Sequence, residues 1–382
     1  MIKLKGLTWD NPRGYEPLEK ATEIYKREHP DVEIIWDKRS LKDFGDVSAA
    51  QYYADYDLMI IDYPSIGNAV AQSAILRLNN LLPNFNMDSL SAQFIGNTLR
   101  SYMHNGSLYA LPVDAACQVS AFRKDLLNRP PTTWPQVMEL SKKLKKDGIY
   151  LAMPFDPTSS FSSFVTIYNN WGMTIFNSRN GLEELHSIRV LEFLQLLYNE
   201  AHPSFLELEP PHILEAMSQT DEIAYVPLIF GYSNYSLDGY RKNRIKFINI
   251  PSAAFGPSGS VLGGAGISIS TRSRFPEAAI QFSMWITSPE VQSNEYIAGH
   301  GQPASKNVWL SYEINRAYDN FYLDTIETMN KAYVRPNFDG FLNIQRNGGM
   351  IIHDFLRNNT SPIEAYKDLA DLWVRYRNPD FR

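Results

Sequence analysis

The first 62 residues alternate between strand-like and helix-like segments, and this alternation constrains the fold more than any other feature of the chain. Residues 2–9 (IKLKGLTW), 32–37 (VEIIWD) and 56–62 (YDLMIID) have the apolar pattern of strands. Residues 16–28 (EPLEKATEIYKRE) have the periodicity of an amphipathic helix. This order predicts a parallel sheet covered by helices, in which ligands bind at the carboxyl ends of the strands.

A carboxylate directly follows the first strand segment, at Asp10, and ends the other two, at Asp37 and Asp62. We expect these residues to lie at one edge of the sheet, because parallel strands end on the same side. Arg13 and Arg39 follow two of the strands, and a guanidinium can grip a carboxylate with a fork of donors. An acidic sugar or another small carboxylate would suit such a site, and solvated ion pairing with Asp10 and Asp37 is the alternative.

The loop TWDNPRGY (residues 8–15) places an indole, a carboxylate and a guanidinium next to one another. A sugar site needs flat aromatic surfaces for C–H faces, and carboxylates, amides or guanidiniums for hydroxyl groups. The loop is therefore a candidate ligand contact through Trp9, Asp10 and Arg13. In the alternative interpretation, Asp10 or Asn11 caps the next helix and Trp9 packs between secondary elements.

The same reasoning selects polar and aromatic residues elsewhere in the chain, at predicted strand ends and in glycine-flanked loops. Aromatic residues make up 13% of the chain, more than cores usually contain, so we expect some of them to line a cleft. The candidate ligand-binding residues are Trp9, Asp10, Arg13, Arg39, Asp62, Tyr63, Asp114, Trp171, Phe230, Tyr232, Gly264 and Gln302.

Local signals also divide the rest of the chain. Asn105-Gly106 between two short apolar runs predicts a hairpin, and Thr133 is placed to cap a helix that begins near Trp134. A second region of strands and helices runs from about residue 150 to 250. A connection rich in Gly, Ser and Pro then leads into a β-rich run, and helices dominate from Pro276 onward.

Composition excludes several classes of protein. The net charge of -6 and the pI near 5.7 give no global attraction for nucleic acid or an anionic membrane. The single cysteine, Cys117, cannot form an internal disulfide, and its apolar surroundings predict a buried thiol. No run approaches the roughly 20 apolar residues that span a bilayer. We expect a monomer.

Motifs of catalysis are absent from the sequence: there is no phosphate-binding loop, zinc-protease helix, nucleophile elbow or paired-cysteine metal site. The seven histidines lack metal-ligand spacing. We therefore expect no enzyme activity, no cofactor and no metal. The alternative is that the three strand-end aspartates bind a divalent ion or act as an acid/base pair.

Longer stretches resemble the family 1 extracellular solute-binding proteins, which are maltose-binding-protein-like components of ABC importers. The resemblance is carried by LYALPVDAACQVSAFRKDLLNRPPTTWPQVMELSKKL (108–144), HPDVEIIW (29–36), LGGAGISIS (262–270), AAIQFSMWITSPEVQ (278–292) and GQPASKNVW (301–309). One departure is Arg123, which stands where the family usually has Asn. The chain also begins without a secretory signal, so the resemblance implies an extracytoplasmic protein, periplasmic or on the cell surface, if a signal was trimmed. If Met1 is the native start, we expect a cytoplasmic one.

The resemblance implies an α/β fold of two lobes, the type II periplasmic-binding-protein-like fold, with mostly parallel sheets flanked by helices. One lobe would contain residues 1–112 and 262–308, and the other residues 113–261 and 309–382. A ligand cleft would lie between them, with hinges at Pro112-Val113 and Val261-Leu262.

The function that follows is that of a non-catalytic solute-binding protein. It would close around a small polar ligand, such as a sugar, a sugar derivative or a sugar acid, and dock on an ABC permease in the membrane. The alternative is a cytoplasmic enzyme or ligand-sensing subunit on the same fold, acting on a small carboxylate or sugar.

Overall fold

The chain folds into two compact units in a computed structural model that describes residues 1–47, 49–176 and 181–377. Unit 1 consists of Met1–Ala115, Gly263–Ser311 and Arg335–Leu342. Unit 2 consists of Ala116–Leu262, Tyr312–Val334 and Asn343–Arg382. The lobe boundaries expected from the sequence, and the cleft between the lobes, stay predictions.

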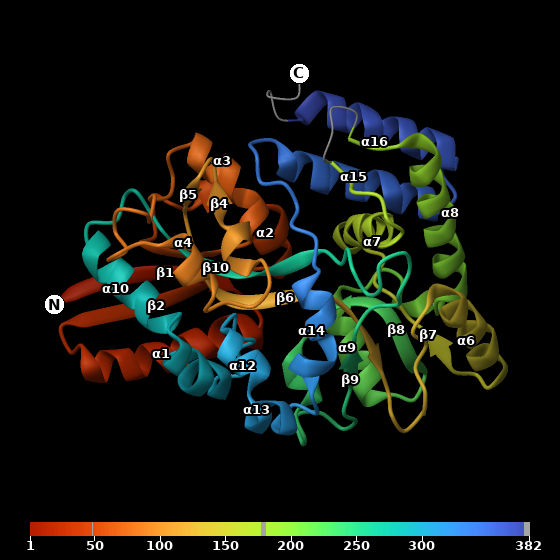
Figure 1. The fold of residues 1–382 in the computed structure, drawn as a ribbon, viewed down its shortest axis with the longest axis horizontal. Coiled ribbons are helices and arrows are strands. Elements are labelled where there is room, and N and C mark those ends of the chain that lie inside the picture. Colours follow the sequence, from red (N-terminus) through yellow and green to blue (C-terminus); the bar gives the residue numbers. More distant parts are fainter. Residues whose placement is uncertain (48, 177–180, 378–382) are drawn as a thin grey trace. The chain divides into compact units, whose positions relative to one another are not determined.

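The sheet of unit 1 has the strand order β2-β1-β3-β10. Figure 1 labels β1, β2 and β10. Its strands are β1 (Ile2–Trp9), β2 (Val32–Arg39), β3 (Leu58–Ile61) and β10 (Leu262–Ile269). β1 runs parallel to β2 and β3, whereas β10 runs antiparallel to β3. Trp9 pairs with Arg39, so the carboxyl ends of β1 and β2 lie level at one edge. The amino end of β10 reaches the same edge, because Gly266 pairs with Ile61.

Unit 1 also contains α-helices and a hairpin. The helices are α1 (Pro12–Glu28), α2 (Leu41–Asp46), α3 (Ile66–Ala71), α4 (Met87–Ser91), α5 (Thr98–Ser101), α10 (Pro276–Ile286), α11 (Pro289–Val291) and α12 (Lys306–Leu310). The hairpin joins β4 (Met103–His104) to β5 (Ser107–Leu108). Its turn residues Asn105 and Gly106 both have positive φ, 47° and 74°, which confirms the predicted two-residue turn.

Helices α1 and α10 pack on the face of the sheet from which Trp36 points. The indole of Trp36 donates a hydrogen bond to Thr22 of α1 at 3.0 Å, and Tyr25 of α1 meets Phe282 of α10 edge to face. Helix α1 begins where the side chain of Asn11 accepts a hydrogen bond from the backbone of the first turn. The cap fixes α1 directly beyond the end of β1.

Unit 2 is built on β6, β8, β7 and β9. Strand β6 (Leu111–Phe122) pairs antiparallel with β8 (Ile223–Phe230) and β9 (Lys246–Ile248), and β7 (Tyr150–Leu151) pairs parallel with β8. The helices with residues in this unit are α6 (Trp134–Lys146), α7 (Pro157–Asn170), α8 (Glu184–Glu200), α9 (Pro210–Gln219), α13 (Tyr312–Ala317), α14 (Phe321–Asn330), α15 (Phe341–Leu356) and α16 (Pro362–Tyr376).

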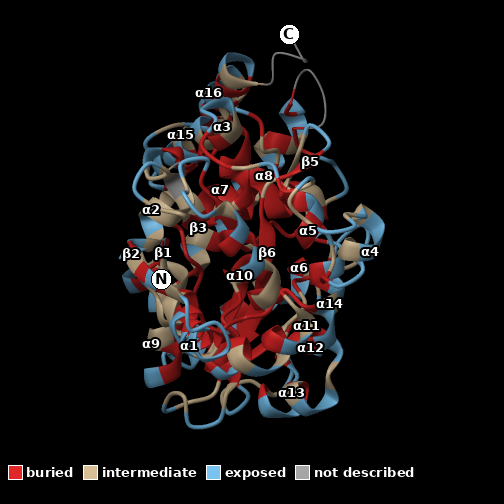
Figure 2. Ribbon diagram, turned by 90° about the vertical axis from the view of Figure 1, so that its left-hand side faces the viewer, coloured by how far each residue is buried: buried red, intermediate tan, exposed pale blue. Residues whose placement is uncertain are grey.

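Burial concentrates on β6 and α7. Every residue of β6 is buried, and so is most of α7, whereas α4 and α13 are largely accessible (Figure 2). Helix α15 fits against the start of α7 because Gly349 has no side chain: a Cβ there would lie 2.4 Å from the carbonyl oxygen of Pro157. None of the helices within the described ranges is long and apolar enough to span a membrane.

The α/β fold class predicted from the sequence is confirmed, although the antiparallel pairings of β10 and β6 make the sheets mixed. The expectation for Asp37 was wrong. Strand β2 continues to Arg39, so Asp37 lies opposite Leu7 inside the sheet and pairs with Lys5 at 2.9 Å. Helix α6 begins at Trp134 as predicted, but the side chain of Thr133 makes no capping hydrogen bond.

Candidate functional site

One edge of the unit 1 sheet gathers most of the residues predicted to bind a ligand. Trp9 and Arg39 end β1 and β2, and Asp62 and Tyr63 directly follow β3. Gly264 is the third residue of β10. It lies two residues before Gly266, which pairs with Ile61 at the end of β3. The edge therefore combines aromatic rings, carboxylates and guanidiniums, as the strand order predicted.

Arg13 holds Asp114 at this edge through two hydrogen bonds. Its Nε donates to Oδ2 at 2.8 Å and its Nη2 donates to Oδ1 at 2.5 Å, and both side chains are buried. Burial raises the pKa of Asp114, and the charge of Arg13 acts in the opposite direction. The fork of Arg13 is thus occupied by a carboxylate of the chain rather than by solvent or Asp10.

Gly264 and Gln302 fix the backbone around Asp114. Gly264 has φ of 110°, and a Cβ at this position would lie 2.4 Å from the carbonyl oxygen of Asp114. The amide of Gln302 donates to the carbonyl oxygen of Ala115 at 2.8 Å. These contacts give both residues a structural role, and their contact with a ligand stays a prediction.

Asp62 and Tyr63 are both held by Arg335, a residue that the sequence analysis missed. Nη2 of Arg335 lies 3.2 Å and 3.0 Å from the two carboxylate oxygens of Asp62, and its Nε donates to the hydroxyl of Tyr63 at 3.2 Å. The guanidinium is buried. No local pattern could have revealed this partner, because it lies 273 residues from Asp62 in the sequence.

Trp9 is packed on both sides. Its ring stacks on Phe44 of α2 with centroids 4.7 Å apart, and a Cβ at Gly14 would lie 2.5 Å from the indole. Only 4% of the residue is exposed. Asn11, rather than Asp10, caps α1, and Asp10 is exposed. The faces that would stack on a sugar are therefore already covered by the protein, whereas the carboxylate of Asp10 is accessible.

Arg39 differs from the other two arginines at the edge. It is 7% exposed, and its Nη2 donates to the carbonyl oxygen of Ile60 at 3.2 Å. Its Nε and Nη1 are buried without a hydrogen-bond partner in the part of the chain that the structure describes. The rings of Phe44 and Tyr52 lie 5.5 Å and 5.3 Å from the guanidinium. Burial lowers the pKa of Arg39 to about 10, so the group stays charged at neutral pH.

The three candidates in unit 2 lie on separate elements. Trp171 follows α7, is half-buried and packs on Phe193 with centroids 5.1 Å apart. Phe230 ends β8 and is half-buried, whereas Tyr232 is 6% exposed. Their contact with a ligand stays a prediction.

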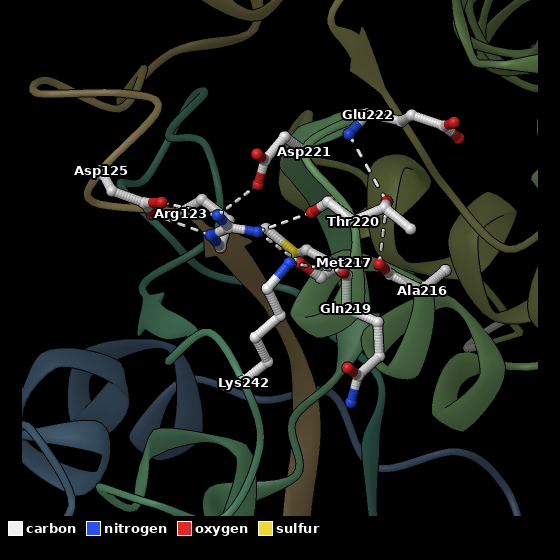
Figure 3. Close-up of polar contacts among 9 residues, drawn as sticks. All are labelled: Arg123, Asp125, Ala216, Met217, Gln219, Thr220, Asp221, Glu222 and Lys242. Carbon is white, nitrogen blue, oxygen red and sulfur yellow. Dashed lines mark hydrogen bonds and ion pairs between the residues drawn. The ribbon is translucent and has the colours of Figure 1, made fainter.

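Arg123, the departure from the family pattern, lies at the centre of a polar cluster in unit 2 (Figure 3). It donates to both carboxylate oxygens of Asp125, to Asp221, and to the carbonyl oxygens of Met217 and Thr220 at the end of α9. A cation at the carboxyl end of a helix complements the helix dipole and its unpaired carbonyl groups. The cluster joins the end of β6 to α9.

A cavity of about 280 Å³ in unit 1 holds none of the predicted residues. It is lined largely by Leu82–Asn86 and by the region around Phe94, Met284 and Pro289. Burial raises the pKa of the Cys117 thiol to about 12, so the predicted buried thiol is confirmed and is a poor nucleophile. No cluster of His, Cys, Asp or Glu suited to a metal ion occurs among the described residues.

Comparison with known proteins gives one family and one fold. The model of the bacterial extracellular solute-binding proteins matches residues 20–320. Maltose-bound MalE3 of T. maritima is 19% identical, with a TM-score of 0.81, over 97% of this chain and 98% of that one. A ribitol complex of an ABC transporter solute-binding protein from Agrobacterium radiobacter is 18% identical, with a TM-score of 0.82, over 98% of both chains. An α-D-tagatose complex from Thermotoga lettingae is 17% identical, with a TM-score of 0.81, over 98% of this chain and 100% of that one.

Proposed function

Since the chain belongs to the family of bacterial extracellular solute-binding proteins, we propose that it is the solute-binding component of an ABC importer. It binds a small sugar, sugar alcohol or sugar acid and releases it chemically unchanged. It acts outside the cytoplasm and delivers the solute to a permease in the membrane.

The observation that carries this proposal is the edge of the unit 1 sheet. There, Arg13 with Asp114 and Arg335 with Asp62 form hydrogen-bonded pairs beside the ends of the strands. These pairs fix the edge on which Asp10 and Arg39 keep polar groups available for a ligand, and a site formed in advance lowers the entropic cost of binding a molecule rich in hydroxyl groups. Structures of the same fold contain maltose, ribitol and α-D-tagatose, which supports a ligand of this class.

A thermal-shift screen tests the ligand class directly. Neutral sugars, sugar alcohols and sugar acids are added one at a time to the full chain, and calorimetric titration confirms each hit. A ligand that binds only the folded protein adds about 2.7 kcal/mol to the free energy of unfolding at a concentration of 100 Kd. The proposal fails if no compound of these classes raises the melting temperature.

Two further measurements test the mechanism. A bound solute recovered after long incubation should have an unchanged mass spectrum; turnover that disappears in Asp62→Asn would instead identify an enzyme. We also expect the two lobes to draw together on binding, as hinged binding proteins do. Small-angle scattering should then give a smaller radius of gyration with the solute, and an unchanged radius at saturation would remove lobe closure from the mechanism.

A further inference from the structure

Three arginines are buried at the edge of the unit 1 sheet, and their partners differ. Arg13 holds Asp114 and Arg335 holds Asp62. Arg39 forms no ion pair with a carboxylate of the described residues, and two of its nitrogens have no acceptor there. We propose that Arg39 binds a carboxylate of the solute, so that the natural ligands are acidic sugars of the uronic or aldonic acid class. This inference rests on the proposed function.

The position of Arg39 fits a ligand contact. It ends β2, level with Trp9 at the end of β1, where a sheet of this kind presents its ligand site. Its guanidinium lies beside the half-buried rings of Phe44, a residue of α2, and Tyr52. One contact to the carbonyl oxygen of Ile60 fixes the guanidinium and leaves Nε and Nη1 for an acceptor.

An anion would stabilise the buried charge of Arg39 better than a neutral hydroxyl group would. A buried cation without a paired anion is costly, because water no longer stabilises the charge. Asp43 and Asp62 raise the pKa of Arg39 from a distance, but Asp62 is already held by Arg335. The rings and the Ile60 carbonyl that contact the guanidinium carry no net charge. A solute carboxylate would supply both the missing charge and the missing acceptors.

A carboxylate fits this place better than a phosphate. A phosphate ester carries close to two negative charges at neutral pH, and phosphate sites usually combine several cations or backbone N–H groups. The neighbouring guanidiniums of Arg13 and Arg335 are each neutralised by an aspartate of the chain. One unneutralised guanidinium matches one carboxylate.

The test compares acids with uncharged molecules of the same shape. Calorimetric titration of the full wild-type chain measures D-galacturonate, D-glucuronate and D-gluconate against D-galactose, D-glucose and D-glucitol. D-glucuronamide and D-galacturonamide replace each uronate carboxylate by a neutral amide of nearly equal size. We expect at least one acid to bind about 10-fold or more tightly than its amide and its neutral parent, as a charge-assisted hydrogen bond requires.

Two substitutions assign this preference to Arg39. Arg39→Met keeps the length of the side chain and should lower the acid-to-amide ratio of affinities about 10-fold, whereas Arg39→Lys keeps the charge and should retain part of the ratio. Arg77→Met is the matched control, because Arg77 is an exposed arginine of the same unit. A ratio of affinities is unaffected by a merely structural loss that weakens both ligands equally.

The outcomes distinguish a failure of the proposed role of Arg39 from a failure of the proposed sugar-binding function. Acids and amides that bind wild-type protein equally well overturn the role of Arg39 and leave the sugar-binding function intact, and this result needs no variant. An acid preference that survives in Arg39→Met also overturns it, because water or another group must then satisfy Arg39. Failure of every neutral and acidic sugar to bind overturns the proposed function itself.

Discussion

Two buried arginines, one in each unit, show how differently the same side chain is used. Arg123 in unit 2 is 1% exposed and donates hydrogen bonds to two aspartates and two backbone carbonyl groups. Arg39 in unit 1 is 7% exposed and donates to one carbonyl group, with two nitrogens unsatisfied among the described residues. A saturated guanidinium stabilises the fold, whereas an unsaturated one keeps binding capacity for a molecule that is not part of the chain.

Arg13 extends this comparison to a guanidinium that is paired with a fully buried carboxylate. Arg13→Met should lower the free energy of unfolding by about 3–5 kcal/mol, because it leaves the charge of Asp114 buried without a partner. Urea unfolding followed by tryptophan fluorescence and circular dichroism measures the loss. Arg13→Met with Asp114→Asn should recover part of the stability, and a double variant as unstable as the single one would contradict this explanation.

Arg123→Met should lower the free energy of unfolding by a smaller amount, about 2–4 kcal/mol. The carbonyl groups of Met217 and Thr220 lose their donor, and each unsatisfied buried group costs about 1–3 kcal/mol. The ion pairs contribute less, because Asp125 and Asp221 are 57% and 71% exposed. The same unfolding experiment checks this value, with Lys124→Met as a control at an exposed neighbour. A loss equal to that of the control would show that Arg123 is not a structural clamp.

Acid should act on the Arg123 cluster in a known direction. Hydrogen bonds from Arg123 hold the pKa of Asp125 below its ordinary value of 3.8. The unfolded chain therefore takes up this proton at a higher pH than the folded chain, so stability falls as the pH drops below about 4 and through the lowered folded value. In Arg123→Met this contribution is missing. The difference between the unfolding midpoints at pH 6 and at pH 3.5 should be larger in the wild type than in Arg123→Met. Equal differences would show that the Arg123–Asp125 pair does not contribute to the pH dependence.

Arg39→Met should have the smallest effect on stability, less than about 1 kcal/mol in either direction. Replacing a buried charge of incomplete pairing by an apolar side chain of similar length is often neutral. Thermal unfolding of the wild type and of Arg39→Met without ligand measures this change in stability. The change in acid preference described above is measured on the same variant. A loss of stability as large as that of Arg123→Met would show that Arg39, like Arg123, mainly stabilises the fold.

Short-range features of this fold could be predicted from the sequence. Strand β1 lies where its apolar alternation indicated, and the Asn105-Gly106 turn and the start of α6 at Trp134 were found from local patterns. Asp62 follows the third strand as expected. These features depend on residues that are neighbours in the chain, so pattern and turn chemistry are sufficient to locate them.

Features that depend on distant partners could not be predicted. The apolar pattern ended the predicted second strand at Asp37, but pairing with β1 extends β2 to Arg39. Trp9 looked accessible, but Phe44 covers its ring. The grouping of Arg13 with Asp114 crosses 101 residues, and no spacing rule connects them. Tertiary contacts, not propensity, decide which polar groups of the edge remain available.

The segment Arg335–Leu342 has a consequence for the order in which the protein is made. It belongs to unit 1, yet the chain reaches it only after passing through most of unit 2. During synthesis on the ribosome, Asp62 cannot form its ion pair until Arg335 has been added, 273 residues later. Closing so long a loop is entropically expensive, and contacts of this separation slow folding. Unit 1, which contains the amino terminus, therefore stays incomplete until most of unit 2 has been synthesised, and a nascent chain released before Arg335 emerges would still have an unfinished first unit.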